Sequence, residues 1–268
     1  MAIRVVMAGA TGWVGRAMIP AIATQGDMKL AGAVARNAAG QDSGAALGFA
    51  PNGIAVSATL EEALATPSDV IVDYTKPDAV KANTLLAIAE GRHVVIGTSG
   101  LSAADYAEID KAAKANGVGV LAAGNFSITA TLMKRFALMA AKYVPDVEVI
   151  DYASAMKPDA PSGTARELAE ALADVRGAST ARPVSEVLGV PGTRGAAVGA
   201  EAGVQVHSLR LPSYILSCEA LFGLPDERLT IRHDAGPSAA PYVAGTLLAI
   251  RRVADFKGLV RGLDALID

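Results

Sequence analysis

The run Lys157–Ala165 reads Lys-Pro-Asp-Ala-Pro-Ser-Gly-Thr-Ala and places a cation a few residues before a candidate helix start. Its prolines favour an extended chain, and Gly163 permits a ligand to approach the backbone closely. Thr164 and Glu167 have the spacing of a capping box that opens a helix over Ala165–Val175. Unpaired N–H groups at a helix start favour a carboxylate or a phosphate. The alternative is an ordinary extended loop that caps a surface helix, and the nearby lysine favours the anion site.

A glycine-rich loop follows the first predicted strand, Ile3–Met7, and precedes a helical run. Glycines in this context permit a tight turn, a close approach of the backbone to a pyrophosphate, and close helix–strand packing. The spacing departs from G-x-G-x-x-G, because Ala10 occupies the first glycine position and Gly9 lies one residue earlier. We predict that a dinucleotide cofactor binds at Gly9, Thr11, Gly12, Trp13, Val14 and Gly15.

The end of the second predicted strand bears on the choice of cofactor. Its sequence, Ala35-Arg36, has no Asp or Glu that would hold the ribose 2′-hydroxyl of NAD. A cation at this point favours the 2′-phosphate of NADPH, with NADH still possible. Arg36 could equally be a solvated charge at the end of a strand.

Two further loops follow the third and fourth predicted strands. They read Asp73-Tyr74-Thr75-Lys76-Pro77 and Gly97-Thr98-Ser99-Gly100. The carboxyl ends of strands face the ligand crevice in a doubly wound sheet. The predicted cofactor contacts in these loops are Tyr74, Thr75, Gly97, Thr98 and Ser99.

The order of elements predicts an α/β fold. Short Val/Ile-rich runs alternate with Ala-rich stretches as far as Leu121, which predicts a parallel, doubly wound sheet covered on both faces. A helix is expected over Ile128–Tyr143 and a strand over Val147–Ala153. Alternating runs at 204–211, 215–222 and 228–233 then predict an antiparallel sheet with one open face. The chain from Ser238 onward returns to an Ala/Leu helix pattern.

Composition excludes several classes of partner. The 268 residues carry a net charge of −3 without a Lys/Arg run, so neither nucleic acid nor an anionic membrane surface is expected to bind. No apolar stretch approaches the ~20 residues of a membrane span. Because Met1 leads directly into a strand-like run, we expect no signal peptide.

The single cysteine and His93 are expected to have structural roles. Cys218 has no cysteine partner in the chain, which favours a protein of the reducing cytoplasm, and one cysteine is too few for a metal cluster. We expect Cys218 to be a small side chain of the core. His93 begins a predicted strand, and we expect a structural role for it.

Taken in order, these motifs resemble the 4-hydroxy-tetrahydrodipicolinate reductase family, also called dihydrodipicolinate reductase. The resemblance also uses Asn125-Phe126-Ser127 and His207-Ser208-Leu209-Arg210, and it covers nearly the whole chain. It implies a Rossmann-like dinucleotide-binding domain made of residues 1–126 and 237–268. It also implies an inserted α+β domain, residues 127–236, that binds substrate and forms a homotetramer.

The resemblance further implies the chemistry. The family transfers a hydride from NAD(P)H to a cyclic imine dicarboxylate on the route to diaminopimelate and lysine. By this resemblance Lys157 contacts the substrate as the catalytic cation, whereas Ser162, Gly163 and Thr164 hold a substrate carboxylate. Asn125 and Phe126 are implied to contact the cofactor.

The chain departs from the family pattern where the proton donor is expected. The family carries a His-His pair four and three residues before the lysine, and here these positions are Ala153 and Ser154. Alanine donates no proton, and a serine hydroxyl has far too high a pKa to replace imidazole well. Tyr152 could donate one, but strand alternation places it on the opposite face from Ala153. We expect His207 and His233 to orient packing or hydrogen bonds.

Two functions therefore remain open from the sequence. The first is an NADPH-dependent reductase of the family, which acts on the lysine-pathway substrate or on a related small carboxylated imine or unsaturated ring. The second is an NADP(H)-binding metabolite sensor without reductase turnover. Retention of Lys157 favours the reductase, because a sensor has little need of a cation at the reacting centre.

Overall fold

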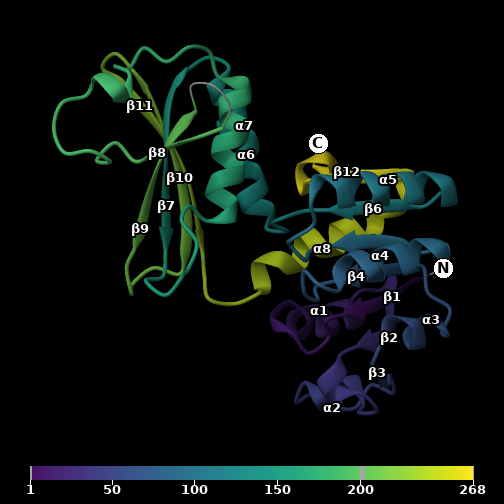
Figure 1. Ribbon diagram of the computed structural model, residues 1–268. Coiled ribbons are helices and arrows are strands. Elements are labelled where there is room, and N and C mark those ends of the chain that lie inside the picture. The colour runs from purple at the N-terminus through teal and green to yellow at the C-terminus, as the bar shows by residue number, and fades with distance from the viewer. Residues whose placement is uncertain (1, 200–202, 268) are drawn as a thin grey trace. The chain divides into compact units, whose positions relative to one another are not determined.

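The computed structural model describes residues 2–199 and 203–267. The chain divides into two compact units, one made of Met1–Ile128 with Ala239–Asp268 and the other of Thr129–Ser238 (Figure 1). Both ends of the chain thus belong to the same unit, and the second unit is an insertion.

The first unit is built on a parallel sheet. Among the described residues this sheet has seven strands in the order β12-β6-β5-β4-β1-β2-β3, and all of its neighbours are parallel. The order reverses at β1, which lies between β4 and β2. The strands are β1 (Ile3–Ala8), β2 (Met28–Val34), β3 (Val56–Ser57), β4 (Val70–Asp73), β5 (His93–Ile96), β6 (Gly119–Ala122) and β12 (Gly258–Arg261).

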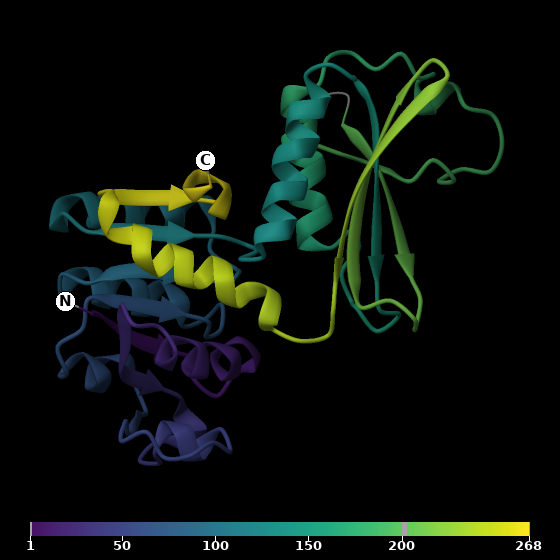
Figure 2. The same cartoon turned by 180° about the vertical axis from the view of Figure 1, so that it is seen from behind.

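Helices cover both faces of this sheet, which explains the continuous apolarity of its strands. Within β1, Val5 and Met7 pack with α1 (Trp13–Ala23) and α8 (Ala240–Arg252), and Figure 2 shows α8 crossing that face. The alternate residues of β1 pack on the other face, which is covered by α3 (Leu60–Leu64), α4 (Val80–Ala89) and α5 (Ala103–Asn116). The predicted doubly wound sheet is confirmed. The short helix α2 (Ser43–Ala46) lies between β2 and β3 in the chain.

Strand β12 was not predicted, because the chain from Ser238 onward was expected to form an Ala/Leu helix followed by a terminal Gly-Leu-Asp-Ala-Leu segment. In the structure α8 ends at Arg252, and Gly258 begins β12 with a φ of +91°. A Cβ on Gly119 of β6 would lie 1.9 Å from the carbonyl oxygen of Val253. The segment that follows α8 therefore packs closely on β6, and this packing places β12 beside β6 at the edge of the sheet.

The second unit contains a mixed sheet. Its order among the described residues is β11-β10-β7-β9-β8. The strands are β7 (Asp146–Ala153), β8 (Ala196–Val198), β9 (Val204–Arg210), β10 (Leu216–Leu224) and β11 (Glu227–Ala235). The expected antiparallel pairing is confirmed for β10 and β11. The expectation that β9 belongs to the same antiparallel arrangement is wrong, because β7 lies between β9 and β10 and pairs with β9 in parallel. A parallel pair needs a long connection, and here α7 and the loop after it supply one.

Two helices cover one face of the mixed sheet. Helices α6 (Ile128–Ala141) and α7 (Gly163–Val175) lie side by side in both views (Figures 1 and 2). They enclose a core with Val149 and Phe222, and Cys218 is buried in it as expected. Side chains alternate between the two faces along β7. Those of Val147, Val149 and Asp151 point toward the helices, and those of Glu148 and Tyr152 point toward the open face.

Candidate functional site

The glycine-rich loop joins β1 to α1, and its glycines have different roles. Gly9 has a φ of +84°, and a Cβ there would lie 2.2 Å from the carbonyl oxygen of Tyr74. A Cβ on Gly15 would lie 2.3 Å from the carbonyl oxygen of Gly9. The turn itself requires both of these glycines. Gly12 is the exposed N-cap of α1, and a Cβ there would lie 3.1 Å from the carbonyl oxygen of Gly9, a tight contact. No side chain therefore covers the start of α1 at this position, where an anion could approach.

A buried carboxylate that the sequence did not single out organises the two neighbouring loops. Asp73 is 0% exposed at the end of β4, and its Oδ1 accepts hydrogen bonds from the Thr75 amide at 2.9 Å, Thr75 Oγ1 at 2.7 Å and Thr98 Oγ1 at 2.8 Å. Its Oδ2 accepts one from Asn83 Nδ2 at 2.9 Å. The hydroxyls of Thr75 and Thr98 thus hold the ends of β4 and β5 together. An Asp followed two residues later by Thr is the sequence signal for such a turn.

The side chains of Tyr74 and Phe126 point into the core. Tyr74 Oη and Thr246 Oγ1 are 2.8 Å apart, and burial raises the pKa of the Tyr74 phenol. The ring of Tyr74 meets that of Phe126 edge-on, with centroids 5.8 Å apart. A Cβ on Gly97 would lie 2.1 Å from the Tyr74 ring, so glycine is needed there for packing. Phe126 is 0% exposed, whereas Tyr74 and Gly97 are partly exposed.

Most of the other predicted cofactor residues lie near the carboxyl ends of the strands and have accessible side chains. Trp13 is 55% exposed as the first residue of α1, and its ring lies edge-on to that of Tyr242. Arg36 follows β2 in an exposed turn, and its side chain makes no hydrogen bond or ion pair with the residues that the structure describes. Thr11 is half-buried and Ser99 is exposed, whereas Val14 is buried in α1. After β6, Asn125 Oδ1 accepts a hydrogen bond from the Ser127 amide at 2.8 Å.

The Lys157–Ala165 run follows the carboxyl end of β7 and leads into α7. The cap of this helix is Ser162, whose Oγ accepts a hydrogen bond from the Ala165 amide at 3.3 Å. The predicted capping box of Thr164 and Glu167 is therefore wrong. The Ser162 amide donates to Asp151 Oδ2 at 2.8 Å, which fixes the helix start at that point, and Glu167 pairs with Lys134 instead.

The start of α7 and the preceding lysine form a candidate anion site, named the anion cradle here and defined as Lys157 with Ser162, Gly163 and Thr164. Gly163 is exposed and has no left-handed φ, and a Cβ added there would meet nothing within 4 Å. The fold of this unit therefore does not require glycine at this position. Lys157 Nζ lies 2.7 Å from Asp159 Oδ1, and this contact lowers the pKa of the Asp159 carboxyl. The cradle thus combines a lysine with an accessible helix N-terminus.

An ion pair beneath the cradle was not identified from the sequence as a functional feature. Asp151 is 0% exposed, and its Oδ2 accepts hydrogen bonds from Arg210 Nη2 at 2.7 Å and from Ser208 Oγ at 3.1 Å. Burial raises the pKa of the Asp151 carboxyl, but the hydrogen bonds from Ser162 and Arg210 outweigh burial and hold it below its usual value. The sequence signal for this pair was the run His207-Ser208-Leu209-Arg210. Because side chains alternate along β9, Ser208 and Arg210 lie on the same face of the sheet as Asp151, and His207 and Leu209 lie on the other face.

Positions 153 and 154, which lie four and three residues before Lys157, contain no titratable acid. Ala153 is 0% exposed, and Ser154 Oγ accepts a hydrogen bond from the Met156 amide at 3.3 Å. Tyr152 lies on the open face of the sheet, as its alternation predicted, and its Oη donates to Glu219 Oε2 at 3.2 Å. Burial and the Glu219 carboxylate raise the pKa of the Tyr152 phenol. Tyr152 therefore does not face the cradle.

Comparison with known proteins decides the family. The model for the N-terminus of dihydrodipicolinate reductase matches residues 3–126, and that for its C-terminus matches residues 129–267. The 4-hydroxy-tetrahydrodipicolinate reductases of Desulfitobacterium hafniense and Synechococcus elongatus are 41% and 40% identical, with 99% of this chain covered in each case. Those alignments cover 99% and 98% of the two relatives. The chain belongs to the dihydrodipicolinate reductase family.

A solved structure of the family agrees with this assignment. The dipicolinate-bound dihydrodipicolinate reductase from Paenisporosarcina is 33% identical, with a TM-score of 0.84 and all of both chains covered. The chain is accordingly an NAD(P)H-dependent oxidoreductase with a Rossmann-like domain and an inserted mixed-sheet domain. These matches do not favour a sensor without turnover.

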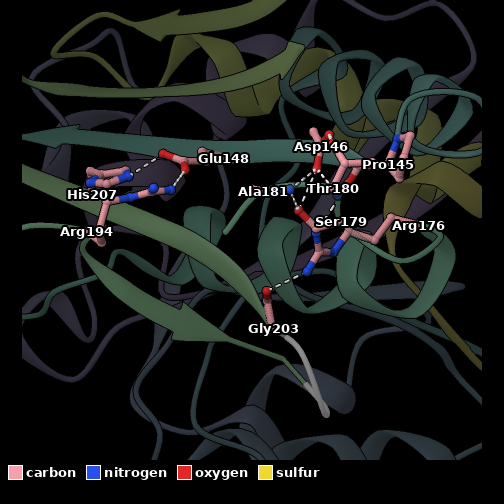
Figure 3. Close-up of polar contacts among 10 residues, drawn as sticks. All are labelled: Pro145, Asp146, Glu148, Arg176, Ser179, Thr180, Ala181, Arg194, Gly203 and His207. Atoms are coloured by element: carbon pink, nitrogen blue, oxygen red, sulfur yellow. Dashed lines mark hydrogen bonds and ion pairs between the residues drawn. The ribbon is translucent and has the colours of Figure 1, made fainter. Parts of the chain in front are cut away.

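A second group of polar contacts in this reductase lies at the opposite end of β7 from the cradle (Figure 3). Glu148 pairs with Arg194, and its Oε2 lies 2.7 Å from His207 Nε2. Asp146 accepts hydrogen bonds from Ser179, Thr180 and Ala181, which anchors the loop after α7. Loop and sheet line an open pocket of about 690 Å³. His207 belongs to this group and is not part of the cradle.

Two other kinds of site are absent from the part of the chain that the structure describes. Among the described residues of this reductase, no helix is long and apolar enough to cross a membrane. The same residues contain no group of three or more His, Cys, Asp or Glu side chains that could hold a metal ion.

Proposed function

We propose that this chain uses NADPH to reduce 4-hydroxy-tetrahydrodipicolinate or a closely related small imine that carries a carboxylate. The observation that carries the proposal is the anion cradle, in which Lys157 precedes an accessible helix start with a glycine that the fold does not require. The names of the relatives support the substrate, and the cradle supports its class, because a helix N-terminus and a lysine together suit a carboxylate.

For the cofactor, we propose that residues 1–126 and 237–268 form its binding domain. The residues present fit a dinucleotide, because the exposed Gly12 places no side chain over the start of α1 while Gly9 and Gly15 shape the turn. Thr11, Trp13 and Val14 would adjoin the pyrophosphate, and the loops at Tyr74–Thr75, Gly97–Ser99 and Asn125–Phe126 would line the rest. When bound, the dihydronicotinamide supplies a hydride.

Arg36 carries the proposed preference for NADPH. Its guanidinium is exposed and has no partner among the described residues, so it is available to the 2′-phosphate. Charge-assisted hydrogen bonds to that phosphate have no counterpart with NADH. NADH is therefore expected to bind at the same loop but more weakly.

The substrate is proposed to bind to residues 127–236. Ser162, Gly163 and Thr164 would hold a substrate carboxylate, and Lys157 would neutralise its charge and orient the imine. Reduction adds a hydride to a carbon of the unsaturated imine that forms when the 4-hydroxyl leaves as water, and one proton balances the hydride. Because positions 153 and 154 hold no titratable acid, we propose that this proton arrives with the substrate as an iminium or comes from water.

We further propose that the enzyme is a cytoplasmic homotetramer assembled through its mixed sheet. Leu209 and Leu229 are 36% and 46% exposed in β9 and β11, and a second subunit would cover such apolar positions. Light scattering of the purified protein should give a mass near four chains. A monodisperse monomer would contradict this assembly.

The proposed reaction is tested with a panel of cyclic imines. Purified protein and NADPH are mixed with the lysine-pathway intermediate, with imines that carry one carboxylate, and with an imine that carries none. NADPH consumption is followed by absorbance, and the reduced product is identified by mass spectrometry. Turnover of carboxylated imines alone supports the proposal, whereas turnover that ignores the carboxylate contradicts it.

A further inference from the structure

We propose that Arg210 is a positioning residue that sets the shape of the anion cradle, an inference that rests on the proposed function of that cradle. Its Nη2 donates to the carbonyl oxygen of Asp159 at 2.8 Å and to Asp151 Oδ2 at 2.7 Å. Asp151 Oδ2 in turn accepts the Ser162 amide at 2.8 Å. One guanidinium nitrogen therefore fixes both ends of the segment Asp159–Ser162.

The two ends of this segment carry the two halves of the cradle. Asp159 holds Lys157 by its carboxylate, with Nζ and Oδ1 2.7 Å apart. Ser162 caps α7, and its own N–H is already used by Asp151, so the orientation of the helix start is fixed. Arg210 thus determines how far the lysine stands from the helix N-terminus, although it belongs to neither half.

The burial of the pair makes this arrangement rigid. The Asp151 side chain is 0% exposed and that of Arg210 is 17% exposed. Oδ1 of Asp151 is buried without a hydrogen-bond partner among the described residues, so Oδ2 alone anchors this carboxylate. A buried carboxylate needs a cation, and here the cation also donates to the backbone. Arg210 Nη1 adds hydrogen bonds to the carbonyl oxygens of Asp151 at 3.4 Å and Leu209 at 2.9 Å.

Lysine is the informative replacement at this position. Arg210→Lys keeps a positive charge beside Asp151 and so keeps most of the stability of the pair. An ammonium is a compact point charge without the planar fork of a guanidinium, and it does not reproduce all four of these contacts. Arg194→Lys is the matched control, because Arg194 also pairs with a carboxylate, Glu148, on the same sheet but away from the cradle.

Four properties of the full-length enzyme are measured for wild type and both variants. These are the dissociation constant of dipicolinate by calorimetry, that of NADPH by Trp13 fluorescence, the midpoint of thermal unfolding, and amide exchange of peptides that cover residues 157–163. Arg210→Lys should weaken dipicolinate binding about tenfold, the equivalent of one charge-assisted hydrogen bond, and should speed exchange in that segment. NADPH affinity should remain within about twofold, and Arg194→Lys should change neither binding constant.

The outcomes separate this inference from the proposed function. If wild type binds dipicolinate and Arg210→Lys binds it as tightly as Arg194→Lys does, Arg210 does not position the cradle. If wild type binds neither dipicolinate nor a carboxylated imine, the proposed function fails and this inference fails with it. Should Arg210→Lys not fold, Asp151→Asn replaces it, because it keeps the shape of the side chain but removes the charge that holds the guanidinium. Unchanged dipicolinate binding in Asp151→Asn would overturn the inference equally.

Discussion

Replacing Gly163 by alanine should stabilise the fold and weaken the substrate site. A Cβ at Gly163 would meet nothing within 4 Å, and the residue begins α7. The methyl group should therefore raise the free energy of unfolding by about 0.4–1 kcal/mol, mainly because it restricts the unfolded chain. This corresponds to a rise of about 1–4 °C in the unfolding midpoint. The same methyl occupies the space above the helix N-terminus, where a carboxylate would approach.

Substrate binding should change in the opposite direction. Displacing a carboxylate from one charge-assisted hydrogen bond costs about 1.5–3 kcal/mol, which raises KM or the dissociation constant of dipicolinate about 10- to 150-fold. Gly223→Ala is the matched control, since a Cβ on this β10 residue also meets nothing within 4 Å but lies opposite Asp146, at the other end of the sheet from the cradle. A Gly163→Ala enzyme with unchanged KM and dipicolinate affinity would refute the assignment of the helix start as the carboxylate site.

Three further changes have defined outcomes. Arg36→Ala should weaken NADPH about tenfold or more without affecting NADH, whereas Lys29→Ala at the start of the same strand should affect neither; Trp13 fluorescence reports both affinities. Thr164→Ala should raise KM about threefold to tenfold with nearly constant kcat in steady-state assays, because it weakens a contact distant from the reacting bond. Burial lowers the pKa of His93, whose Nδ1 accepts the Gly119 amide, so the unfolded chain binds the proton more readily and stability should fall as pH drops below about 6.5. Unfolding midpoints at about pH 7.5 and 5.5 should show this loss in wild type and a smaller one in His93→Asn.

The parallel sheet was predictable because its strands are buried on both faces. Their apolar runs are continuous, and the glycine loop follows the first of them, so local sequence is sufficient. Strand β12 was not predictable in this way, because it has four residues and its position depends on packing beside β6. The parallel pairing of β9 with β7 likewise depends on contacts across a long connection, and no local pattern reports them.

The four residues of the cradle were predicted from the sequence, but the hydrogen bonds that position them were not. The pattern at Thr164 and Glu167 is a valid capping box taken alone, yet Asp151 holds the Ser162 amide and moves the cap two residues earlier. Asp151 and Arg210 are 59 positions apart, so their pairing has no local signal. Tyr74 was similarly predicted to contact the cofactor from its place after a strand, whereas the direction of its ring is set by packing.

The central claim is that Lys157 is the catalytic cation of an NADPH-dependent reductase. The direct test is single-turnover reduction of 4-hydroxy-tetrahydrodipicolinate by Lys157→Ala, with Lys142→Ala, an exposed lysine of the same unit, as the control. The account predicts a rate lowered about 100-fold or more, as for loss of a group that acts on the reacting centre, with NADPH affinity unchanged by Trp13 fluorescence. A Lys157→Ala enzyme that reduces the substrate as fast as wild type would contradict the account.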